Sequence, residues 1–571
     1  MPTVTSAKRS SQLRSLVRRD REFHYGDPVA DIGVAELIAS WADDDDIGLV
    51  FGDQSWTWSE TVAESSARAS WLSAVLDPAT PPNVGILLDN TPDFVFTLFG
   101  AALAGACVVG INSTRRGNEL ERDIVHTDCR FVLTDNAHLG LRIADSAVPT
   151  VLVEDAPWRA HNGAALPHAY PDPSTLLLLI FTSGSTSAPK AVRRSSGRIA
   201  AAASIGFVKD DALYCAMPLI HGNALFGALF PALASGARTI LRERFSATEW
   251  LTDIRKYGAT FSTSVGRALA YILATPPTND DKDHSLKVVL APETSPRDAA
   301  AFTERFGVPV ITGYGSSEGG ITLLPSRRHG ALGRAPKDTS IVVINTETGV
   351  EQDVADIDEN GLLRNPEQAI GELVRRGSLG SFEGYWRNTE ADADRIKDGW
   401  FYSGDLAYRD ADGVFFFAGR VGGWLRVDSE NFAAAPVERI LGRYPGVAGV
   451  AVVGVPDAQS GDQVLAAFEL SDDAAFDPHD FVTWLEAQPD LGTKWSPAYV
   501  RICKALPTVS HDKIDRRLLR REAWLTSDPV WHRAPRAASY RLLDNGARDA
   551  LRRAFDEHGR AAMHPDPIDA G

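Results

Sequence analysis

The chain has 571 residues and a formal net charge of −17, and 44% of its residues are hydrophobic. A chain of this length is too long for one ordinary hydrophobic core, so we expect at least two domains. The acidic balance argues against a nucleic-acid partner, because counterion release requires clustered Lys and Arg, and four cysteines without metal-type spacing favour a cytoplasmic location.

The first 29 residues form a basic leader that lacks the apolar core of a signal peptide. One uncharged, mostly apolar stretch, 94–111, is near the length that spans a membrane. A helix start at 90–93 precedes it, and Gly105 and Gly110 interrupt it. We therefore predict a buried helix followed by a buried strand, and no integral membrane segment.

Apolar strands alternate with helical patterns from residue 30 to about residue 315. We predict strands at 47–51, 55–58, 84–88, 107–112, 131–134, 176–181, 212–217, 239–241, 261–264, 288–291 and 310–312. The predicted helices include 118–126, 197–206, 225–235, 247–257, 268–274 and 296–306. This alternation implies a mostly parallel sheet covered on both faces, arranged in two α/β halves.

The character of the sequence changes beyond residue 335. Short strands and turns indicate a small β subdomain, and 424–525 indicate a compact α+β unit. We therefore predict an α/β protein with two hinged domains. Its parts are a leader (1–29), a large domain of two α/β subdomains plus the β subdomain (30–419), a small mobile α+β domain (420–525) and a tail (526–571).

The stretch after the strand at 176–181 concentrates hydroxyl groups. It runs Thr182-Ser183-Gly184-Ser185-Thr186 and continues to Pro189-Lys190. Hydroxyls and backbone N–H groups in such a loop wrap phosphate oxygens, and Lys190 adds a positive charge. It is not a Walker loop, since no Gly-Lys-Ser/Thr follows a second glycine. The apolar strand before it makes a disordered Ser/Thr linker the weaker interpretation.

A second glycine-rich stretch follows the strand at 310–312. The run Gly313-Tyr314-Gly315-Ser316-Ser317-Glu318-Gly319-Gly320 allows a ligand to approach the backbone, and Glu318 offers the hard oxygen that Mg²⁺ prefers. A glycine-rich turn with a solvated glutamate explains this run equally well by itself. Together with the phosphate loop, a nucleotide site explains it better.

These stretches resemble signatures of the adenylate-forming superfamily, which includes acyl-CoA synthetases, peptide-synthetase adenylation domains and firefly luciferase. The resemblance covers roughly 30–525 and is greatest to the fatty-acid-transport-protein-like branch of acyl-CoA synthetases. It implies that 182–186 and Lys190 bind the phosphates of ATP and that Glu318 and Thr186 hold its magnesium. It also implies that the nucleotide lies against Tyr314, Gly315, Ser316 and Ser317, with Tyr314 near the adenine and Ser317 near the α-phosphate.

Two residues resemble the ribose contacts of the same superfamily. Asp405, in Trp400-Phe401-Tyr402-Ser403-Gly404-Asp405-Leu406, is placed by its context on a turn, and a carboxylate accepts two hydroxyl hydrogen bonds at once. A lone aspartate in a turn is more often a capping residue, but this context matches the family specifically. Arg420 resembles the arginine that contacts the ribose and begins the hinge.

Two more residues resemble catalytic or acid-pocket positions. Lys513, within 506–514, resembles the C-terminal catalytic lysine, which bridges the attacking carboxylate and the α-phosphate and stabilises developing negative charge. The alternative is a surface lysine beside Arg516 and Arg517. His221, after Met217-Pro218-Leu219-Ile220, matches a position that lines the acid pocket, although a lone histidine is more often structural.

The hinge and acceptor region departs from the family pattern. Gly422 stands where Asp or Lys is common, and Gly423 replaces a usual Asp. Arg426 replaces a lysine of the second half-reaction, and Ser429 replaces a glycine past which the CoA arm runs. A Ser hydroxymethyl at such a close approach would obstruct or bend that passage.

The resemblance implies a ligase that uses ATP and Mg²⁺ to convert a carboxylic acid into an acyl-AMP and then transfers the acyl group to CoA, as in fatty acid metabolism. A first alternative keeps adenylation but not CoA, as in natural-product diazotases that activate nitrite for reaction with an aromatic amine. The altered hinge and the sequence Leu290-Ala291-Pro292-Glu293-Thr294 favour it. A second alternative is a non-catalytic ATP-binding relative, against which Lys513 and Glu318 argue.

Overall fold

The computed structural model describes residues 31–113, 115, 117–142, 146–182, 189–204, 206–292, 294, 296–326, 328, 330–346, 348–358, 363–420, 424–427, 430–458, 462–488, 491, 495–510, 513–534, 537–557 and 564–565. The chain divides into two compact units. The first unit comprises Met1–Ile341 and Arg375–Tyr402, and the second comprises Val342–Val374 and Ser403–Gly571. A segment that follows part of the second unit in sequence therefore belongs to the first.

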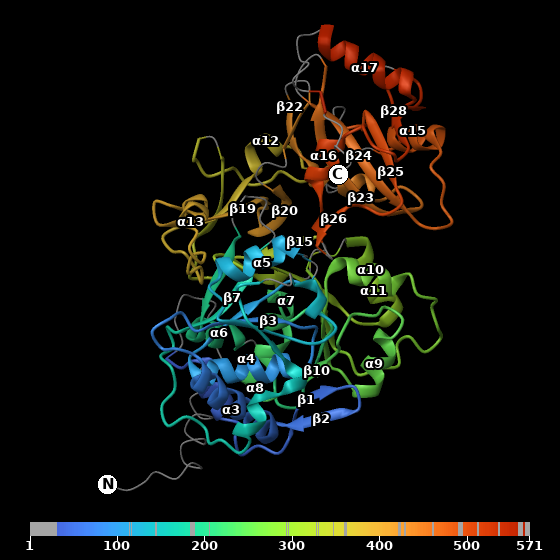
Figure 1. Cartoon of the computed structure of the whole chain (residues 1–571). Helices are drawn as coiled ribbons and strands as arrows, with labels where there is room; N and C mark the ends of the chain where they lie inside the picture. Colours follow the sequence, from blue (N-terminus) through green and yellow to red (C-terminus); the bar gives the residue numbers. More distant parts are fainter. Residues whose placement is uncertain are drawn as a thin grey trace. The chain divides into compact units, whose positions relative to one another are not determined.

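The first unit contains a large, mostly parallel sheet (Figure 1). Within this unit its strands run in the order β15-β14-β13-β12-β11-β9-β10-β1-β2. Strands β1, β10, β9, β11, β12 and β13 pair in parallel, so their carboxyl ends meet at one edge. The bounds are β1 (Ile47–Phe51), β2 (Gln54–Thr57), β9 (Ala212–Cys215), β10 (Arg238–Leu241), β11 (Phe261–Thr263), β12 (Val288–Leu290), β13 (Val310–Gly315), β14 (Thr322–Ser326) and β15 (Ala331–Arg334).

A second sheet of the first unit has six strands in the order β6-β5-β3-β4-β7-β8. All neighbours pair in parallel except β7 and β8, which form an antiparallel pair. The bounds are β3 (Asn83–Leu87), β4 (Cys107–Gly110), β5 (Phe131–Thr134), β6 (Thr150–Leu152), β7 (Leu176–Phe181) and β8 (Ala191–Ser195). Strand β7 is the apolar strand predicted at 176–181, with the same bounds.

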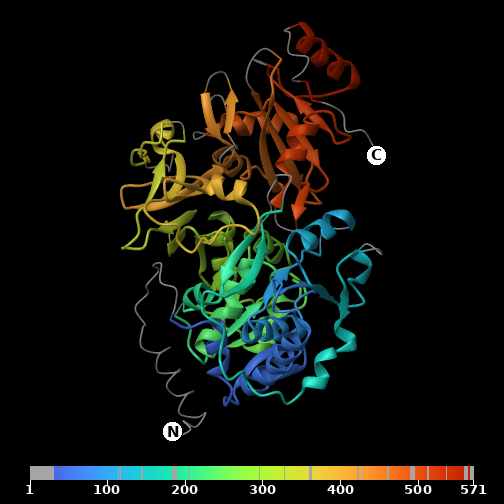
Figure 2. The ribbon, with the colours of Figure 1, turned by 60° about the vertical axis from the view of Figure 1, so that its left-hand side comes forward.

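Helices cover these sheets, and α3 and α4 lie side by side (Figures 1 and 2). The helices of the first unit are α2 (Val34–Ala39), α3 (Trp58–Val75), α4 (Pro92–Ala104), α5 (Gly117–His126), α6 (Ser196–Ala203), α7 (Gly222–Ala224), α8 (Phe230–Ser235), α9 (Trp250–Tyr257), α10 (Gly266–Leu273), α11 (Pro296–Phe306) and α13 (Thr389–Arg395). Short 3-10 turns occupy Leu139–Leu141, Val153–Asp155 and Pro157–His161. A π-helix, Leu225–Leu229, lies between α7 and α8.

The buried helix predicted after residue 90 is confirmed, and local sequence explains its ends. The Thr91 hydroxyl caps α4, Pro92 occupies its first turn, and Gly105 ends it at φ 73°, a left-handed conformation that glycine adopts without strain. Strand β4 follows directly. Among the described residues no helix is both long and apolar enough to cross a membrane.

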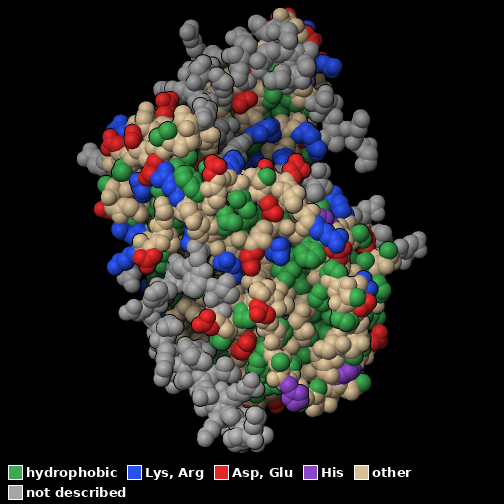
Figure 3. Space-filling model, turned by 90° about the vertical axis from the view of Figure 1, so that its left-hand side faces the viewer, with side chains coloured by type: hydrophobic (Ala, Val, Ile, Leu, Met, Phe, Trp, Pro, Cys, Tyr) green, Lys and Arg blue, Asp and Glu red, His purple; other side chains and the backbone are tan. Residues whose placement is uncertain are grey.

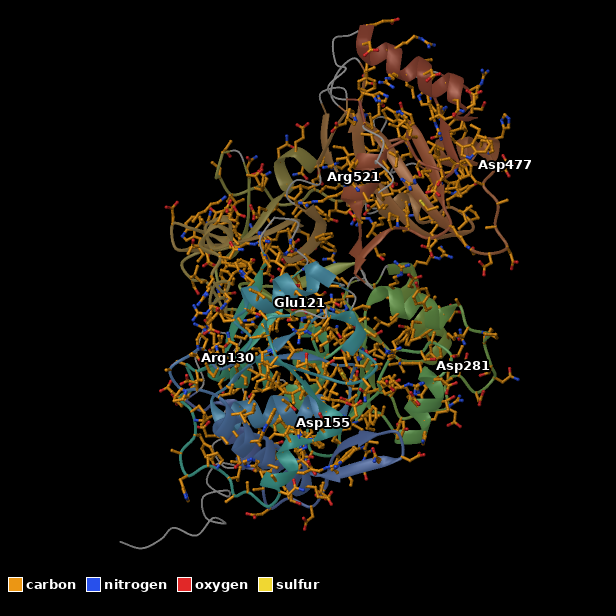
Figure 4. The ribbon with its side chains drawn as sticks, viewed as in Figure 1. Glu121, Arg130, Asp155, Asp281, Asp477 and Arg521 are labelled. Atoms are coloured by element: carbon orange, nitrogen blue, oxygen red, sulfur yellow. The ribbon has the colours of Figure 1, made fainter. Side chains whose placement is uncertain are left out.

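Two aromatic groups anchor the core of the first unit. Trp41 and Trp58 stack with ring centroids 5.9 Å apart. Trp250 of α9 packs edge-on against Phe302 and Phe306 of α11, at 5.5 and 5.4 Å. Buried ion pairs also connect segments of the first unit. Arg305 of α11 donates to Asp281 at 2.6 Å and Arg142 donates to Glu121 of α5 at 2.9 Å; both carboxylates are labelled in Figure 4.

The second unit combines a small β region with a five-stranded sheet. The β region is formed by strands in the order β16-β17-β19-β20, and the sheet runs β23-β24-β25-β28-β29. The strands are β16 (Ile341–Ile344), β17 (Gly371–Arg375), β19 (Trp400–Arg409), β20 (Val414–Arg420), β21 (Trp424–Val427), β22 (Glu430–Ala433), β23 (Val447–Pro456), β24 (Asp462–Leu470), β25 (Tyr499–Cys503), β26 (Thr508–Ser510), β27 (Lys513–Ile514), β28 (Val530–His532) and β29 (Arg541–Leu542). Its helices are α12 (Pro366–Ala369), α14 (Ala434–Leu441), α15 (Pro478–Glu486), α16 (Arg516–Glu522) and α17 (Asn545–Glu557), and β18 (Ile396–Lys397) of the first unit pairs with the start of β19.

Three features differ in detail from the expected elements. The helix predicted at 225–235 begins as a π-helix. The strand predicted at 310–312 continues to Gly315. The segment from residue 526, predicted as a tail, contributes β28 and β29 to the five-stranded sheet and adds α17.

On the face shown in Figure 3, acidic and basic side chains are interspersed.

Candidate active site

The predicted phosphate loop connects two strands of the six-stranded sheet. Phe181 at the end of β7 lies opposite Ala191 at the start of β8, so the loop closes as a hairpin. The Thr182 N–H donates to the Lys190 carbonyl at 3.0 Å, and the Asn388 amide donates to the carbonyl of Pro189 at 3.2 Å. The tip of the loop, Ser183, Gly184, Ser185 and Thr186, lies outside the described residues.

The Lys190 side chain is only 12% exposed. Its Nζ lies 3.6 Å from the Asp394 carboxylate and 5.9 Å from the centroid of the Tyr385 ring. Asp394 is itself 63% exposed, and an ion pair with so exposed a partner contributes little stability. This ion pair therefore contributes little to holding the Lys190 side chain in place.

The second predicted stretch begins inside β13, which includes Tyr314 and Gly315. Ser316 and Ser317 follow at the carboxyl edge of the parallel strands, where ligands of α/β sheets bind. Glu318 comes next and is buried, with 8% of its surface exposed. The Tyr385 hydroxyl donates a hydrogen bond of 2.9 Å to Oε1 of Glu318.

Tyr385 is a site residue that sequence reasoning missed. Its hydroxyl binds Glu318, its ring lies beside Lys190, and its backbone forms a bridge with Val192 of β8. It therefore brings the predicted metal carboxylate and the predicted phosphate lysine together. Burial, reinforced by the charge of Glu318, raises the pKa of the Tyr385 phenol well above its usual value, so it donates a hydrogen bond at neutral pH. The sequence offered no local signal for this contact, because Tyr385 and Glu318 lie 67 positions apart.

Arg194 of β8 is a second unpredicted residue. Its guanidinium donates to the carbonyl oxygens of Ser317 at 2.7 Å and Ser381 at 2.8 Å. Burial lowers the pKa of Arg194 to about 10, against the opposing effect of Glu383 and Glu318, so the group stays charged at neutral pH. Arg194 thus places a buried positive charge next to the loop that carries Glu318.

The segment around His221 also approaches this loop. His221 directly precedes α7, and its N–H donates to the Pro218 carbonyl at 3.0 Å. A Cβ added to Gly222 would lie 3.4 Å from the Phe226 ring and 4.0 Å from the Ser317 hydroxyl. The predicted acid-side residue and the predicted α-phosphate residue therefore belong to neighbouring segments of the first unit.

The second unit pairs the two predicted ribose residues. Asp405 lies within β19 rather than on a turn, because the hairpin turn comes later, at 410–413. Asp405 stands opposite Arg420 in the antiparallel ladder with β20. Asp405 is 8% exposed, and its N–H donates to the Ser403 hydroxyl at 3.1 Å.

The remaining predicted residues lie partly or wholly outside the described residues. Lys513 begins β27, and its backbone pairs with Ser510. Arg426 lies in β21, opposite Asn431. Gly422, Gly423 and Ser429 are outside the described residues.

One buried carboxylate of the first unit, Glu318, fits a magnesium ion that arrives with a nucleotide. Among the described residues no cluster of three or more His, Cys, Asp or Glu forms a self-sufficient metal site. Mg²⁺ is held in nucleotide sites by one or two carboxylates together with substrate phosphates and water. Glu318 is one buried carboxylate that contacts Tyr385, whose ring lies beside Lys190, the lysine predicted to bind phosphate; this composition fits such a site.

A mostly parallel α/β unit, with a hairpin loop after β7 and a buried carboxylate after β13, is the arrangement expected of an adenylate-forming ligase. The chain belongs to the AMP-binding enzyme family: the family model matches residues 40–386, and the model of the AMP-binding enzyme C-terminal domain matches 436–513.

Two curated relatives match most of the chain. The steroid-22-oyl-CoA synthetase of Rhodococcus jostii is 45% identical over 544 residues, which cover 92% of this chain and 98% of the relative. The medium/long-chain-fatty-acid–CoA ligase FadD17 of Mycobacterium marinum is 40% identical over 513 residues, covering 88% of this chain and 98% of the relative.

Solved structures share the fold at lower sequence identity. The anthranilate CoA ligase AuaEII in complex with anthranoyl-AMP superposes with a TM-score of 0.76 at 20% identity, covering 86% of this chain and 97% of its own. ATP-bound MatB from Rhodopseudomonas palustris superposes with a TM-score of 0.74 at 22% identity, covering 86% and 98%. These likenesses confirm the predicted α/β fold class.

Proposed function

We propose that this protein is an ATP- and Mg²⁺-dependent acid–CoA ligase whose acid is large and apolar, with a steroid that carries a side-chain carboxylate as the first candidate. The general class follows from the family and from relatives that are CoA ligases. The choice of acid is supported by 45% identity to a steroid-22-oyl-CoA synthetase along nearly the whole of both chains. A medium- or long-chain fatty acid is the second candidate, because FadD17 is 40% identical.

The described residues near His221 agree with an apolar acid. Ile220, Phe226 and Leu290 are partly exposed apolar side chains. They follow β9, lie in the π-helix and end β12, respectively, at the carboxyl edge of the parallel strands. This edge therefore offers the acid an apolar surface beside residues 316–320, the loop after β13, which we call the Ser317 loop. π-helical turns are frequent at functional sites.

The residues of this chain have distinct roles in the proposed reaction. Lys190 and the loop 182–186 bind the phosphates, Asp405 and Arg420 bind the ribose, and Tyr314, Gly315, Ser316 and Ser317 border the nucleotide. A carboxylate oxygen of the acid attacks the α-phosphorus, the bond to pyrophosphate breaks, and acyl-AMP forms. Lys513 places positive charge where negative charge develops. Glu318 and Thr186 would hold magnesium, which would supply positive charge against the phosphates.

The second half-reaction transfers the acyl group to the CoA thiol and releases AMP. Because Gly423 and Ser429 depart from the family pattern, the sequence alone did not identify the acceptor of the acyl group. CoA is favoured because one relative is named a CoA synthetase and the other a CoA ligase. The CoA-independent diazotase becomes the alternative that the assay must address.

The test measures pyrophosphate release and AMP release with and without CoA, and identifies products by mass spectrometry. The acids are a steroid with a C22 carboxylate, saturated fatty acids of medium and long chain, benzoate, and nitrite with an aromatic amine. We expect CoA-dependent AMP release and a steroid acyl-CoA product, with kcat/KM highest for the steroid acid.

Higher kcat/KM for a fatty acid would move the assignment to the second candidate. Turnover that requires nitrite and an amine but not CoA would refute the ligase. No turnover with any acid, together with ATP binding, would indicate a non-catalytic relative.

A further inference from the structure

A buried tyrosine contacts the carboxylate to which the proposed function assigns magnesium. Tyr385 is 3% exposed, and its hydroxyl lies 2.9 Å from Oε1 of Glu318. The Nε of Arg395 donates to the same hydroxyl at 3.4 Å. The phenol thus accepts from a cation on one side and donates to Glu318 on the other, which fixes the direction of its proton.

The ring of Tyr385 is held from several directions. Its backbone N–H donates to the Asp392 carboxylate at 2.8 Å, and its ring packs edge-on against Phe382 with centroids 5.2 Å apart. Its backbone also bridges Val192 of β8. Because the backbone and the ring are both anchored, the hydroxyl has little freedom to leave Glu318.

A hydrogen bond to one carboxylate oxygen fixes the plane of the group and directs the other oxygen. Groups that hydrogen-bond to a metal ligand orient it, and their loss typically costs 10–100-fold in metal affinity or activity. We propose that Tyr385 is a positioning residue that holds Glu318 through Oε1, so that Oε2 is presented to the magnesium of MgATP. This inference rests on the role assigned to Glu318 under the proposed function.

The same residue touches the phosphate side of the site. Lys190 Nζ lies 5.9 Å from the ring centroid of Tyr385, and β8, which Tyr385 bridges, begins one residue after Lys190. Tyr385 therefore connects the metal carboxylate to the strand that anchors the phosphate lysine. Loss of the hydroxyl should weaken metal binding in the nucleotide complex while the ring still packs.

The test compares Tyr385→Phe with Tyr214→Phe in the full chain. Tyr214 is a matched control: it is 1% exposed and its hydroxyl donates to a buried carboxylate, Asp253, at 2.8 Å. Mn²⁺ affinity is measured by electron paramagnetic resonance in the presence of α,β-methylene ATP, which cannot transfer its adenylyl group because its α–β bridge is a methylene. Binding of AMP without metal and thermal unfolding are measured in parallel.

We expect Tyr385→Phe to raise the Kd of Mn²⁺ about 10-fold or more, while AMP affinity stays within about 2-fold of the native value. Tyr214→Phe should leave the Kd of Mn²⁺ unchanged, whatever it does to stability. In turnover, Tyr385→Phe should raise the Mg²⁺ concentration for half-maximal rate more than it lowers kcat at saturating Mg²⁺. An unchanged Kd of Mn²⁺, or equal shifts in both variants, would overturn the inference.

Glu318→Gln separates this inference from the proposed function. If Glu318→Gln leaves the Kd of Mn²⁺ unchanged, Glu318 is not the metal ligand and the inference fails. If Mn²⁺ binding depends on both Glu318 and Tyr385 but no acid yields a CoA thioester, the inference stands and the proposed acid–CoA ligase function fails.

Discussion

Arg194 places a buried positive charge next to the Ser317 loop. Arg194 is 6% exposed and charged at neutral pH, since burial lowers its pKa only to about 10. Its guanidinium is occupied by two backbone carbonyls, and its Nε has no hydrogen-bond partner among the described residues. A buried cation held in this way supplies a fixed positive potential next to Glu318, and a fixed charge needs no reorganisation when a polyphosphate binds.

We predict that Lys513 is required for the adenylation step. Lys513→Ala should lower the rate of acyl-AMP formation about 100-fold or more, because it removes positive charge from developing negative charge, and ATP affinity should change little. Pyrophosphate exchange and equilibrium ATP binding measure the two effects. Lys504→Ala, at an exposed position of the same unit, is the control. Adenylation that survives in Lys513→Ala would remove this lysine from the mechanism.

The sequence predicted most elements of the first unit because each carries a strong local signal. Strand 176–181 is a continuous apolar run, and α4 has a threonine cap, a first-turn proline and a terminal glycine. Asp405 was misplaced on a turn, because Ser-Gly-Asp is a common turn composition and the ladder partner Arg420 lies fifteen positions later. No characteristic amino-acid composition distinguishes a π-helix from an α-helix. The apolar spacing of 225–235 therefore predicted an ordinary α-helix.

Tyr385 and Arg194 escaped prediction for a different reason. Tyr385 reaches Glu318 from 67 positions away, and Arg194 reaches Ser317 from 123 positions away. Contacts across such separations depend on which sheet edges meet, which local patterns do not encode. The loops that hold Lys190 and Glu318 could be predicted, but the side chains that connect them could not.

Gly319 tests the packing of the Ser317 loop against β8. Its φ is +64°, and a Cβ there would meet the guanidinium of Arg194. Gly319→Ala should lower stability by more than the ~1–2 kcal/mol expected for a left-handed alanine, and should slow adenylation. Urea unfolding and pyrophosphate exchange measure both. Gly163→Ala, with φ +81° and no atom within 4 Å of the added Cβ, isolates the backbone contribution.

A double variant makes that prediction stricter. If the clash with Arg194 matters, Gly319→Ala combined with Arg194→Ala should be less destabilised than the sum of the two single variants. Strictly additive losses would show that the cost of Gly319→Ala is backbone strain alone.

His532 of β28 makes the second unit sensitive to acid. Its ring stacks on Tyr499 with centroids 4.7 Å apart, and burial lowers the pKa of His532 below its usual 6.5. The unfolded chain therefore takes up this proton at a higher pH than the folded chain does, so stability present above about pH 6.5 is lost as the pH falls below it. His532→Phe should show a smaller drop in urea midpoint between about pH 7.5 and pH 5. The exposed His479→Phe should behave as the native chain, and an unchanged drop in His532→Phe would contradict the prediction.

The segment from residue 526 onward is part of the fold of the second unit. Phe555 of α17 is 1% exposed and lies 6.0 Å from the fully buried Trp524, ring to ring. Phe555→Ala should cost about 3 kcal/mol or more, as expected for a fully buried phenylalanine. Leu542→Ala, at a position 54% exposed, should cost little. Thermal unfolding and limited proteolysis distinguish them, and equal stability of the two variants would show that the segment is dispensable.

The order in which the chain visits its two units limits how the protein can be recombined with its relatives. The backbone passes between the units after Ile341, after Val374 and after Tyr402. In a chimera joined once, after Ile341, residues 1–341 come from one protein and the stretch with Tyr385, Asp394 and Arg395 comes from the other. Glu318 and Lys190 would then contact side chains from the other protein. Exchange of acid specificity between homologues should therefore succeed when residues 375–402 are transferred together with residues 1–341. Transfer of residues 1–341 alone should yield proteins that fold but bind the metal–nucleotide complex weakly.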